Sequence, residues 1–131
     1  MNYLFDTSVF IWARSFPERL NRRARELVSL KSETLYLSAA SSWEIGLKYL
    51  HGKLELPDPP GLYVPAAMNM WSIRALDISH RHALGVAELP LLHHDPFDRM
   101  LIAQARLEGM VLLTADRMFE KYEAETIWCG N

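Results

Sequence analysis

The sequence lacks the features that mark secreted, membrane-spanning or disulfide-bonded proteins. It contains a single cysteine, Cys129, which excludes an intrachain disulfide and a cysteine-based zinc site. No uncharged run approaches the ~20 residues that a membrane span needs, and Asp6 stands where a secretory leader would be apolar. These absences favour the cytoplasm as the compartment and predict no membrane partner.

Net charge is also small, because 14 Lys and Arg residues face 16 Asp and Glu residues and leave a formal charge of −2. This balance excludes a strongly basic nucleic-acid coat protein. Half of the 131 residues are hydrophobic and 23% are charged, as in ordinary folded globular chains and unlike disordered ones. With no repeat, linker or low-complexity segment, the length predicts one domain over residues 1–131.

Apolar runs and helical patterns alternate along the whole chain. The patterns predict short strands at 3–5, 34–37, 73–78, 110–113 and 126–128 and helices at 18–31, 62–71, 80–88, 97–108 and 116–122, with a further helix ending at 51. This alternation predicts an α/β fold with a central, mainly parallel sheet and helices on both faces. Ligands of such folds bind beyond the carboxyl ends of the strands, so a site is expected at the strand-to-helix junctions.

Four carboxylates occupy four of these junctions. Asp6 directly follows the first strand, Glu44 lies in the first helical turn after the second strand, Asp98 lies in the first turn of the 97–108 helix, and Asp116 follows the 110–113 strand. Because the carboxyl ends of parallel strands meet at one edge of the sheet, we expect these acids to lie near one another.

Each acid, taken singly, also fits helix capping. Ser41 and Glu44 match the capping-box pattern S-x-x-E, and Asp95 followed by Pro96 matches an N-cap with proline at the first helical position. A helix N-terminus stabilises a nearby acid by only ~0.3–1 kcal/mol. Two carboxylates ~5 Å apart repel by about 3 kcal/mol at an effective dielectric constant near 20. A cluster would therefore raise the carboxylate pKa values or bind cations.

An all-oxygen ligand set predicts a hard divalent cation, Mg²⁺ or Mn²⁺. Asp6, Asp98 and Asp116 are the expected metal ligands, with Glu44 completing the set directly or through water. Such a centre indicates metal-assisted phosphodiester hydrolysis, in which the ion activates a water molecule and stabilises charge on the phosphate. Zinc is not expected, because the five histidines offer no third ligand at a familiar spacing from His80 and His82 or from His93 and His94.

Four segments also carry recognisable motifs in order: LFDT at 4–7, AASSWEI at 39–45, HDPFDRMLIAQA at 94–105 and LTAD at 113–116. Together they resemble the successive motifs of PIN-domain ribonucleases, and specifically of the VapC toxins of bacterial toxin–antitoxin pairs. The resemblance covers essentially the whole chain, and the block at 95–99 is its most specific part. Ser8 departs from it, since many relatives carry His after the Asp-Thr pair.

The resemblance implies a three-layer α/β/α PIN-like fold and an Mg²⁺- or Mn²⁺-dependent endoribonuclease whose catalytic acids match Asp6, Glu44, Asp98 and Asp116. It implies a homodimer that acts on RNA and is inhibited by a cognate VapB-like antitoxin lying over the site. Two other functions remain open: a catalytically silent RNA- or protein-binding module, and a PIN nuclease of RNA processing without a toxin role. A receiver domain is disfavoured, because Asp6 has no adjacent acid.

Several neighbouring residues have two readings. Thr7 and Thr114 could orient a carboxylate or a metal-bound water, or they could cap helices and turns. Asp95 could likewise orient a ligand of the ion without binding the ion itself, or it could cap a helix. Arg99 and Arg117 follow core acids and could contact phosphate or form salt bridges. Residues 14–31 carry six basic and two acidic side chains, a pattern that fits both RNA contact and a solvated helix face.

Overall fold

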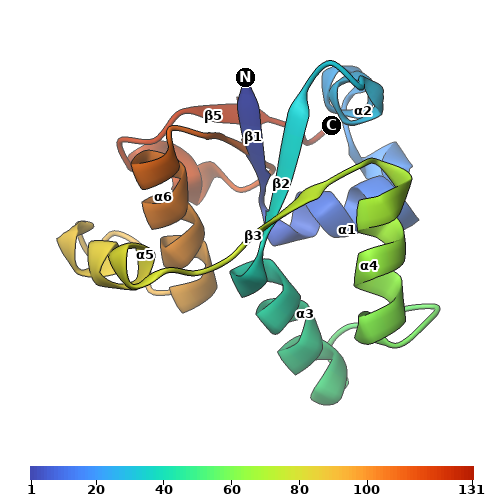
Figure 1. The fold of residues 1–131 in the computed structure, drawn as a ribbon, viewed down its shortest axis with the longest axis horizontal. Coiled ribbons are helices and arrows are strands. Elements are labelled where there is room, and N and C mark those ends of the chain that lie inside the picture. The colour runs from blue at the N-terminus through green and yellow to red at the C-terminus, as the bar shows by residue number, and fades with distance from the viewer.

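A five-stranded parallel sheet forms the centre of the molecule (Figure 1). The computed structural model describes residues 1–131, and the strands lie in the order β3-β2-β1-β4-β5. Their bounds are β1 (Asn2–Phe5), β2 (Thr34–Ser38), β3 (Arg74–Leu76), β4 (Val111–Thr114) and β5 (Thr126–Trp128). The predicted α/β class is confirmed, and every strand pair is parallel.

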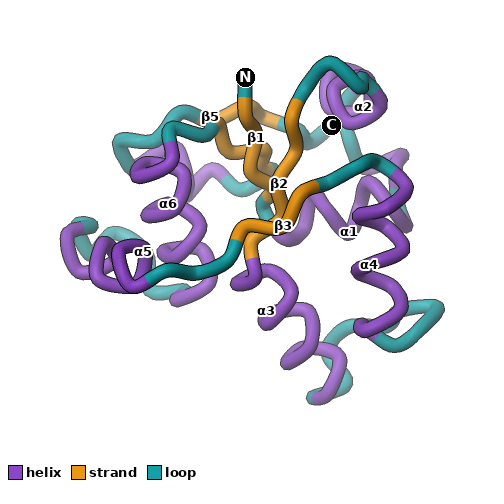
Figure 2. The backbone as a smooth tube through the Cα atoms, viewed as in Figure 1, coloured by secondary structure: helices purple, strands orange, loops and turns teal.

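Helices cover both faces of the sheet and complete three layers (Figures 1 and 2). One face carries α1 (Thr7–Ser15), α2 (Arg22–Ser29) and α4 (Pro60–Met70), and the other carries α5 (His80–Gly85) and α6 (Pro96–Glu108). The remaining helix, α3 (Ala39–Leu50), continues from β2 beyond the carboxyl ends of the strands. None of these helices combines the length and the hydrophobicity needed to cross a membrane.

Alternation along the strands divides the interior into two cores. Tyr3 and Phe5 of β1 contribute to the larger core beneath α1, α2 and α4, whereas Leu4 contributes to the smaller core beneath α6. The same alternation places Leu113 of β4 in the larger core and Leu112 in the smaller one. Because both faces are covered, β4 is buried along its whole length and its first three residues are apolar, as expected for a buried parallel strand.

The start of α3 differs from the prediction. The strand before it continues to Ser38, whose hydroxyl accepts a hydrogen bond from the backbone N–H of Ala40 (3.0 Å) and so caps the helix. The capping box predicted for Ser41 and Glu44 is therefore wrong, and Glu44 lies in the second turn. Ser41 Oγ instead accepts a hydrogen bond from Thr7 Oγ1 (2.8 Å) on α1.

Other boundaries also differ. The predicted 80–88 helix is α5 (His80–Gly85) followed by a 3₁₀ turn over Val86–Glu88. The predicted 18–31 helix is shortened to α2, because residues 17–19 form a separate 3₁₀ turn and Asn21 caps α2 by accepting from Ala24 N. The predicted 116–122 helix is a 3₁₀ turn over Arg117–Lys121. Pro65 lies inside α4, which starts at Pro60, two residues earlier than expected.

Two glycines provide a matched test of helix energetics. Gly109 ends α6 in the left-handed conformation (φ 66°), whereas Gly46 lies inside α3, and a Cβ would meet no atom within 4 Å at either position. Gly109→Ala should lower the free energy of unfolding by about 1 kcal/mol because of the backbone strain. Gly46→Ala should raise it by ~0.5–1 kcal/mol. Urea denaturation of both variants measures the difference, and equal effects would contradict this account.

Candidate active site

The site lies at the carboxyl ends of β1 and β4. In the sheet, β2 and β3 lie on one side of β1, whereas β4 and β5 lie on its other side. The order of connections therefore reverses between β1 and β4, and α/β folds form ligand crevices at such a reversal. Asp6 directly follows β1, and Asp116 follows β4 by two residues. Glu44 comes from α3 and Asp98 from the first turn of α6. Four separate segments thus supply the four predicted acids.

Asp6 is buried, with 5% of its surface exposed, and it occupies the N-cap position of α1 without making a capping hydrogen bond. Its Oδ2 accepts a hydrogen bond from Thr114 Oγ1 (3.0 Å) on the neighbouring strand. Burial, followed by the charges of Asp98, Glu44 and Asp116, raises the pKa of Asp6 to about 7, although the hydrogen bond from Thr114 opposes the shift. The three other acids therefore lie close enough to Asp6 to disfavour its ionisation.

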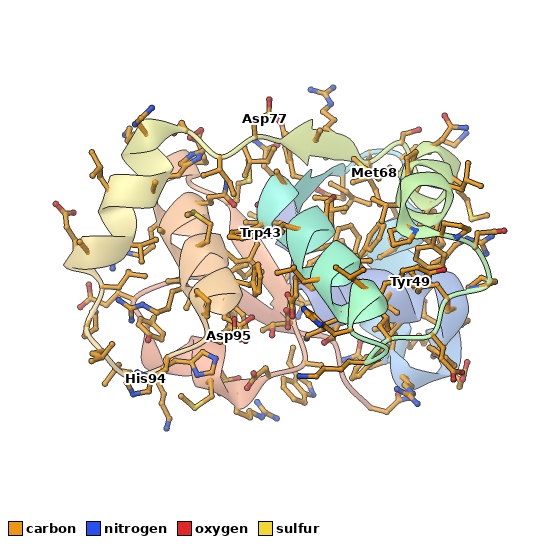
Figure 3. All side chains as sticks on the ribbon, turned by 90° about the horizontal axis from the view of Figure 1, so that it is seen from below. Trp43, Tyr49, Met68, Asp77, His94 and Asp95 are labelled. Atoms are coloured by element: carbon orange, nitrogen blue, oxygen red, sulfur yellow. The ribbon has the colours of Figure 1, made fainter.

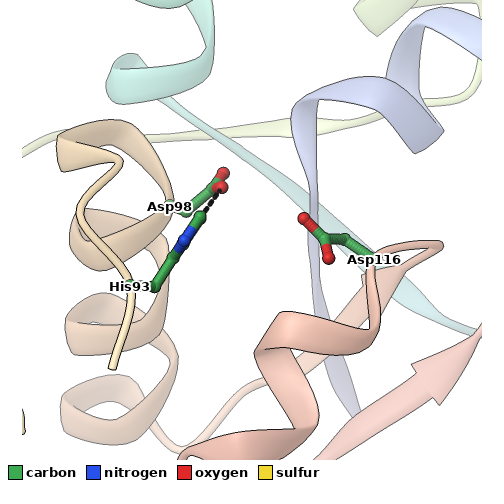
Figure 4. A group of neighbouring side chains, drawn as sticks. All are labelled: His93, Asp98 and Asp116. Carbon is green, nitrogen blue, oxygen red and sulfur yellow. Dashed lines mark hydrogen bonds and ion pairs between the residues drawn. The ribbon is translucent and has the colours of Figure 1, made fainter. Parts of the chain in front are cut away.

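Asp98 and Asp116 form a tighter group with His93 (Figure 4). His93 Nε2 lies 2.8 Å from Asp98 Oδ2, and one ligand atom from each of the three residues lies within 4.8 Å of the others. Burial raises the pKa of Asp98 to about 6; the hydrogen bond and charge of His93 oppose the shift, and the charges of Asp95 and Glu44 add to it. Asp6 and Glu44 lie outside this tighter group.

Glu44 is the most unusual of the acids in its hydrogen bonding. It is 5% exposed, and its Oε2 pairs with Lys48 Nζ (2.5 Å) one turn further along α3. Its Oε1 is buried and has no hydrogen-bond partner. Buried carboxylate oxygens are rarely left unpaired, so this atom indicates a place for a cation or an ordered water.

Aromatic side chains connect the two helices that carry Glu44 and Asp98. Trp43 projects from α3 toward α6 (Figure 3) and packs edge-to-face on Phe97, with ring centroids 5.0 Å apart. Trp43 directly precedes Glu44, and Phe97 directly precedes Asp98. This contact couples the positions of the two carboxylates, even though 61% of the Trp43 surface is exposed.

The other candidate residues near the four acids make different contacts. Asp95 Oδ1 accepts hydrogen bonds from Phe97 N (2.9 Å) and Asp98 N (3.0 Å), which confirms its predicted N-cap position. The Thr114 hydroxyl donates a hydrogen bond to Asp6, whereas the Thr7 hydroxyl donates to Ser41. Figure 3 shows Asp95 nearer the centre of the molecule and His94 at its edge.

The arginines beside the acids do not contact them. Arg117 pairs with Glu120 (2.7 Å) and stacks on the Trp128 ring, 3.7 Å from its centroid. Arg99 is buried and donates to backbone carbonyls of the preceding loop instead of to a carboxylate. Sequence reasoning did not find the roles of His93, Arg99 or Lys48. Lys48 had a local signal, since it lies four residues after Glu44 on one helix face.

The donor set fits a divalent cation. Three aspartates and a glutamate supply hard oxygen ligands, two of these acids have raised pKa values, and Glu44 Oε1 has no partner within the chain. A cation would offset the mutual repulsion that burial intensifies. Asp98 and Asp116, whose ligand atoms lie in one group, are candidates to hold it together with the neighbouring Asp6 and Glu44.

Comparison with known proteins gives consistent results at the level of family and fold. A family model described as the PIN domain matches residues 3–125. A segment of 58 residues, 44% of the chain, is 40% identical to Ribonuclease VapC16 of Mycobacterium tuberculosis, but it spans only 41% of that relative's length.

The fold is similar to that of several solved structures. VapBC2 from Rickettsia felis, bound to a DNA fragment from its promoter, gives a TM-score of 0.75 at 18% identity, over 98% of this chain and 99% of that one. FitAcB from Neisseria gonorrhoeae gives 0.69 at 21% identity, over 95% and 96% of the two chains. At these identities the likeness extends to the fold alone.

The raised pKa of Asp6 predicts that this acid destabilises the metal-free protein. Its pKa in the fold, about 7, exceeds the ordinary value of 3.8, so the native state binds more protons between those pH values and stability falls as pH rises through them. In EDTA at pH 8, Asp6→Asn should raise the free energy of unfolding by up to about 4 kcal/mol. The gain should shrink toward pH 5.

Urea denaturation at both pH values measures this effect. Addition of Mn²⁺ should then stabilise the wild type more than the variant, because the ion needs the carboxylate. A variant that is less stable than wild type in EDTA at pH 8 would contradict the raised pKa of Asp6.

Proposed function

The chain belongs to the PIN domain family, and from that membership we propose that it is an endoribonuclease that hydrolyses RNA phosphodiester bonds with a carboxylate-bound Mg²⁺ or Mn²⁺. The observation that carries the proposal is the convergence of Asp6, Glu44, Asp98 and Asp116 at the carboxyl ends of β1 and β4. The partial identity to a curated ribonuclease supports the same reaction. All four acids are present, which disfavours a catalytically silent module.

Each residue has a distinct task in this mechanism. The bound cation would supply an activated water and would stabilise charge on the phosphate. Thr114 fixes the orientation of the Asp6 carboxylate through its hydroxyl, and Lys48 holds one oxygen of Glu44. The other oxygen, Glu44 Oε1, is then available to accept a proton or a hydrogen bond from the attacking water. Burial excludes competing solvent from Asp6.

A basic cleft beside the acids supports a phosphate-bearing substrate. The cleft has a volume of about 210 Å³ and is lined by Glu44 together with the cationic side chains of Arg19, Lys48 and Lys53. The Arg19 guanidinium lies over the Phe16 ring, 4.6 Å from its centroid. Cations next to exposed aromatic rings are the elements that bind single-stranded RNA by phosphate contact and base stacking.

The same proposal extends to a biological role. The curated relative is named Ribonuclease VapC16, and one structural relative, from Klebsiella pneumoniae, is described as a toxin–antitoxin complex. We therefore propose that this chain is the toxin of a type II pair, inhibited by a VapB-like antitoxin, and that it acts as a homodimer in the cytoplasm. Growth arrest on expression, relieved by co-expression of the neighbouring small reading frame, tests this role.

Replacement of a single acid should abolish cleavage. Asp98→Asn and Asp116→Asn should each reduce Mn²⁺-dependent cleavage of a fluorescent RNA by at least ~100-fold, since each removes a ligand from an ion whose effect on the barrier is several kcal/mol. Asp95→Asn is the matched control, because asparagine also caps helices and the acid has no proposed ligand role. Circular dichroism checks the fold. An active Asp98→Asn protein would refute the mechanism.

The basic cleft predicts an effect on substrate binding alone. Arg19→Ala should raise KM by ~10-fold, leave kcat nearly unchanged and make KM less sensitive to salt, because one phosphate contact is lost. Arg22→Ala is the control, since Arg22 pairs with Glu26 (2.9 Å) on the exposed surface of α2. Equal KM values for the two variants would contradict a role of the cleft in substrate binding.

A further inference from the structure

The loop before α6 is fixed in place by a buried cation. Arg99 is 9% exposed, and its guanidinium donates hydrogen bonds to four backbone carbonyls, those of Val86, Leu89, Pro90 and His93, at 2.9–3.3 Å. A fifth bond reaches the Tyr122 hydroxyl (3.3 Å). Because Arg99 directly follows Asp98 on α6, it fixes the backbone of His93 relative to the residue that carries the carboxylate.

The His93 side chain points into the group of acids (Figure 4). Its Nε2 lies 2.8 Å from Asp98 Oδ2, and the group of ligand atoms that it forms with Asp98 and Asp116 spans no more than 4.8 Å. Two adjacent ligands at about 2.1 Å from one ion lie about 3 Å apart, and two opposite ligands lie about 4.2 Å apart. The observed spacing fits ligation of one ion by all three residues after small rotations of the side chains.

The charge of the site favours such a donor. Burial and the neighbouring acids already raise the pKa of Asp6 and Asp98, so a further carboxylate would add repulsion. A neutral imidazole adds an electron pair without adding negative charge. Half-buried at 22% side-chain exposure, His93 is also shielded from the solvent that covers His94.

We propose that His93 is a nitrogen ligand of the catalytic cation, so that the centre has mixed nitrogen and oxygen donors and takes Mn²⁺ in preference to Mg²⁺. Imidazole suits transition ions, whereas Mg²⁺ is held by oxygen donors. The inference rests on the proposed metal-dependent function. In the alternative, His93 serves only to hold Asp98 by a hydrogen bond, and it then has no contact with the ion.

Pulsed electron paramagnetic resonance of bound Mn²⁺ separates the two roles without any RNA. The wild type and His94→Ala should show a nitrogen hyperfine coupling to the manganese. In protein labelled with ¹⁵N-histidine, this coupling should change from that of ¹⁴N to that of ¹⁵N. His93→Gln, which keeps a hydrogen-bond donor for Asp98, should lose the coupling. By calorimetry it should bind Mn²⁺ at least ~10-fold more weakly, with Mg²⁺ affinity changed less than ~3-fold.

The outcomes are decisive in either direction. Bound Mn²⁺ without nitrogen coupling in the labelled wild type overturns the inference, and this measurement needs no variant to fold. Coupling that persists in His93→Gln or disappears in His94→Ala overturns it as well. If the coupling is present but RNA is not cleaved, the proposed function fails and the ligand assignment stands. If RNA is cleaved but the coupling is absent, the ligand assignment fails and the proposed function stands. Failure to bind Mn²⁺ refutes both.

Discussion

Electrostatic repulsion among four carboxylates is the constraint on which the arrangement of the site depends. Each acid has one donor: Asp6 accepts from Thr114, Glu44 from Lys48, Asp98 contacts His93, and Asp116 accepts from the N–H of Met118. A single partner orients each carboxylate and leaves other oxygens available. The neutral donors on Asp6 and Asp116 position these two acids without offsetting their charge, and the remaining negative charge favours a cation.

The sheet makes this arrangement possible because β1 is paired on both sides. Its neighbours β2 and β4 continue into α3 and into the turn that carries Asp116, so the ends of three adjacent strands converge. Two separate apolar cores hold these strands from opposite faces. Packing of this kind keeps the backbone rigid at the point where charges are crowded, and the Arg99 contacts extend the same rigidity to the loop before α6.

The sequence was informative where the determinants are local. Apolar runs predicted the strands to within a few residues, and the Asp95–Pro96 pair predicted the start of α6. The prediction for α3 was wrong because two serines, Ser38 and Ser41, compete for one cap, and the contact that decides between them comes from Thr7, 34 residues away.

The partners of the acids were harder to predict for the same reason. Thr114 and Asp6 are 108 residues apart, and the loop position of His93 depends on Arg99, whose backbone partners in that loop cannot be read from the sequence. The convergence of the four acids could be anticipated from the parallel topology. The orientation of each side chain could not, because it is set by tertiary hydrogen bonds.

The pairing of β1 with β4 has a consequence for the order of synthesis. Tyr3 pairs with Val111, so β1 is synthesised well before its second neighbour in the sheet is available. Asp116 and Thr114 reach the site still later. A partly made chain therefore holds only some of the four acids, and the full set is assembled only when β4 and the turn after it have joined the sheet.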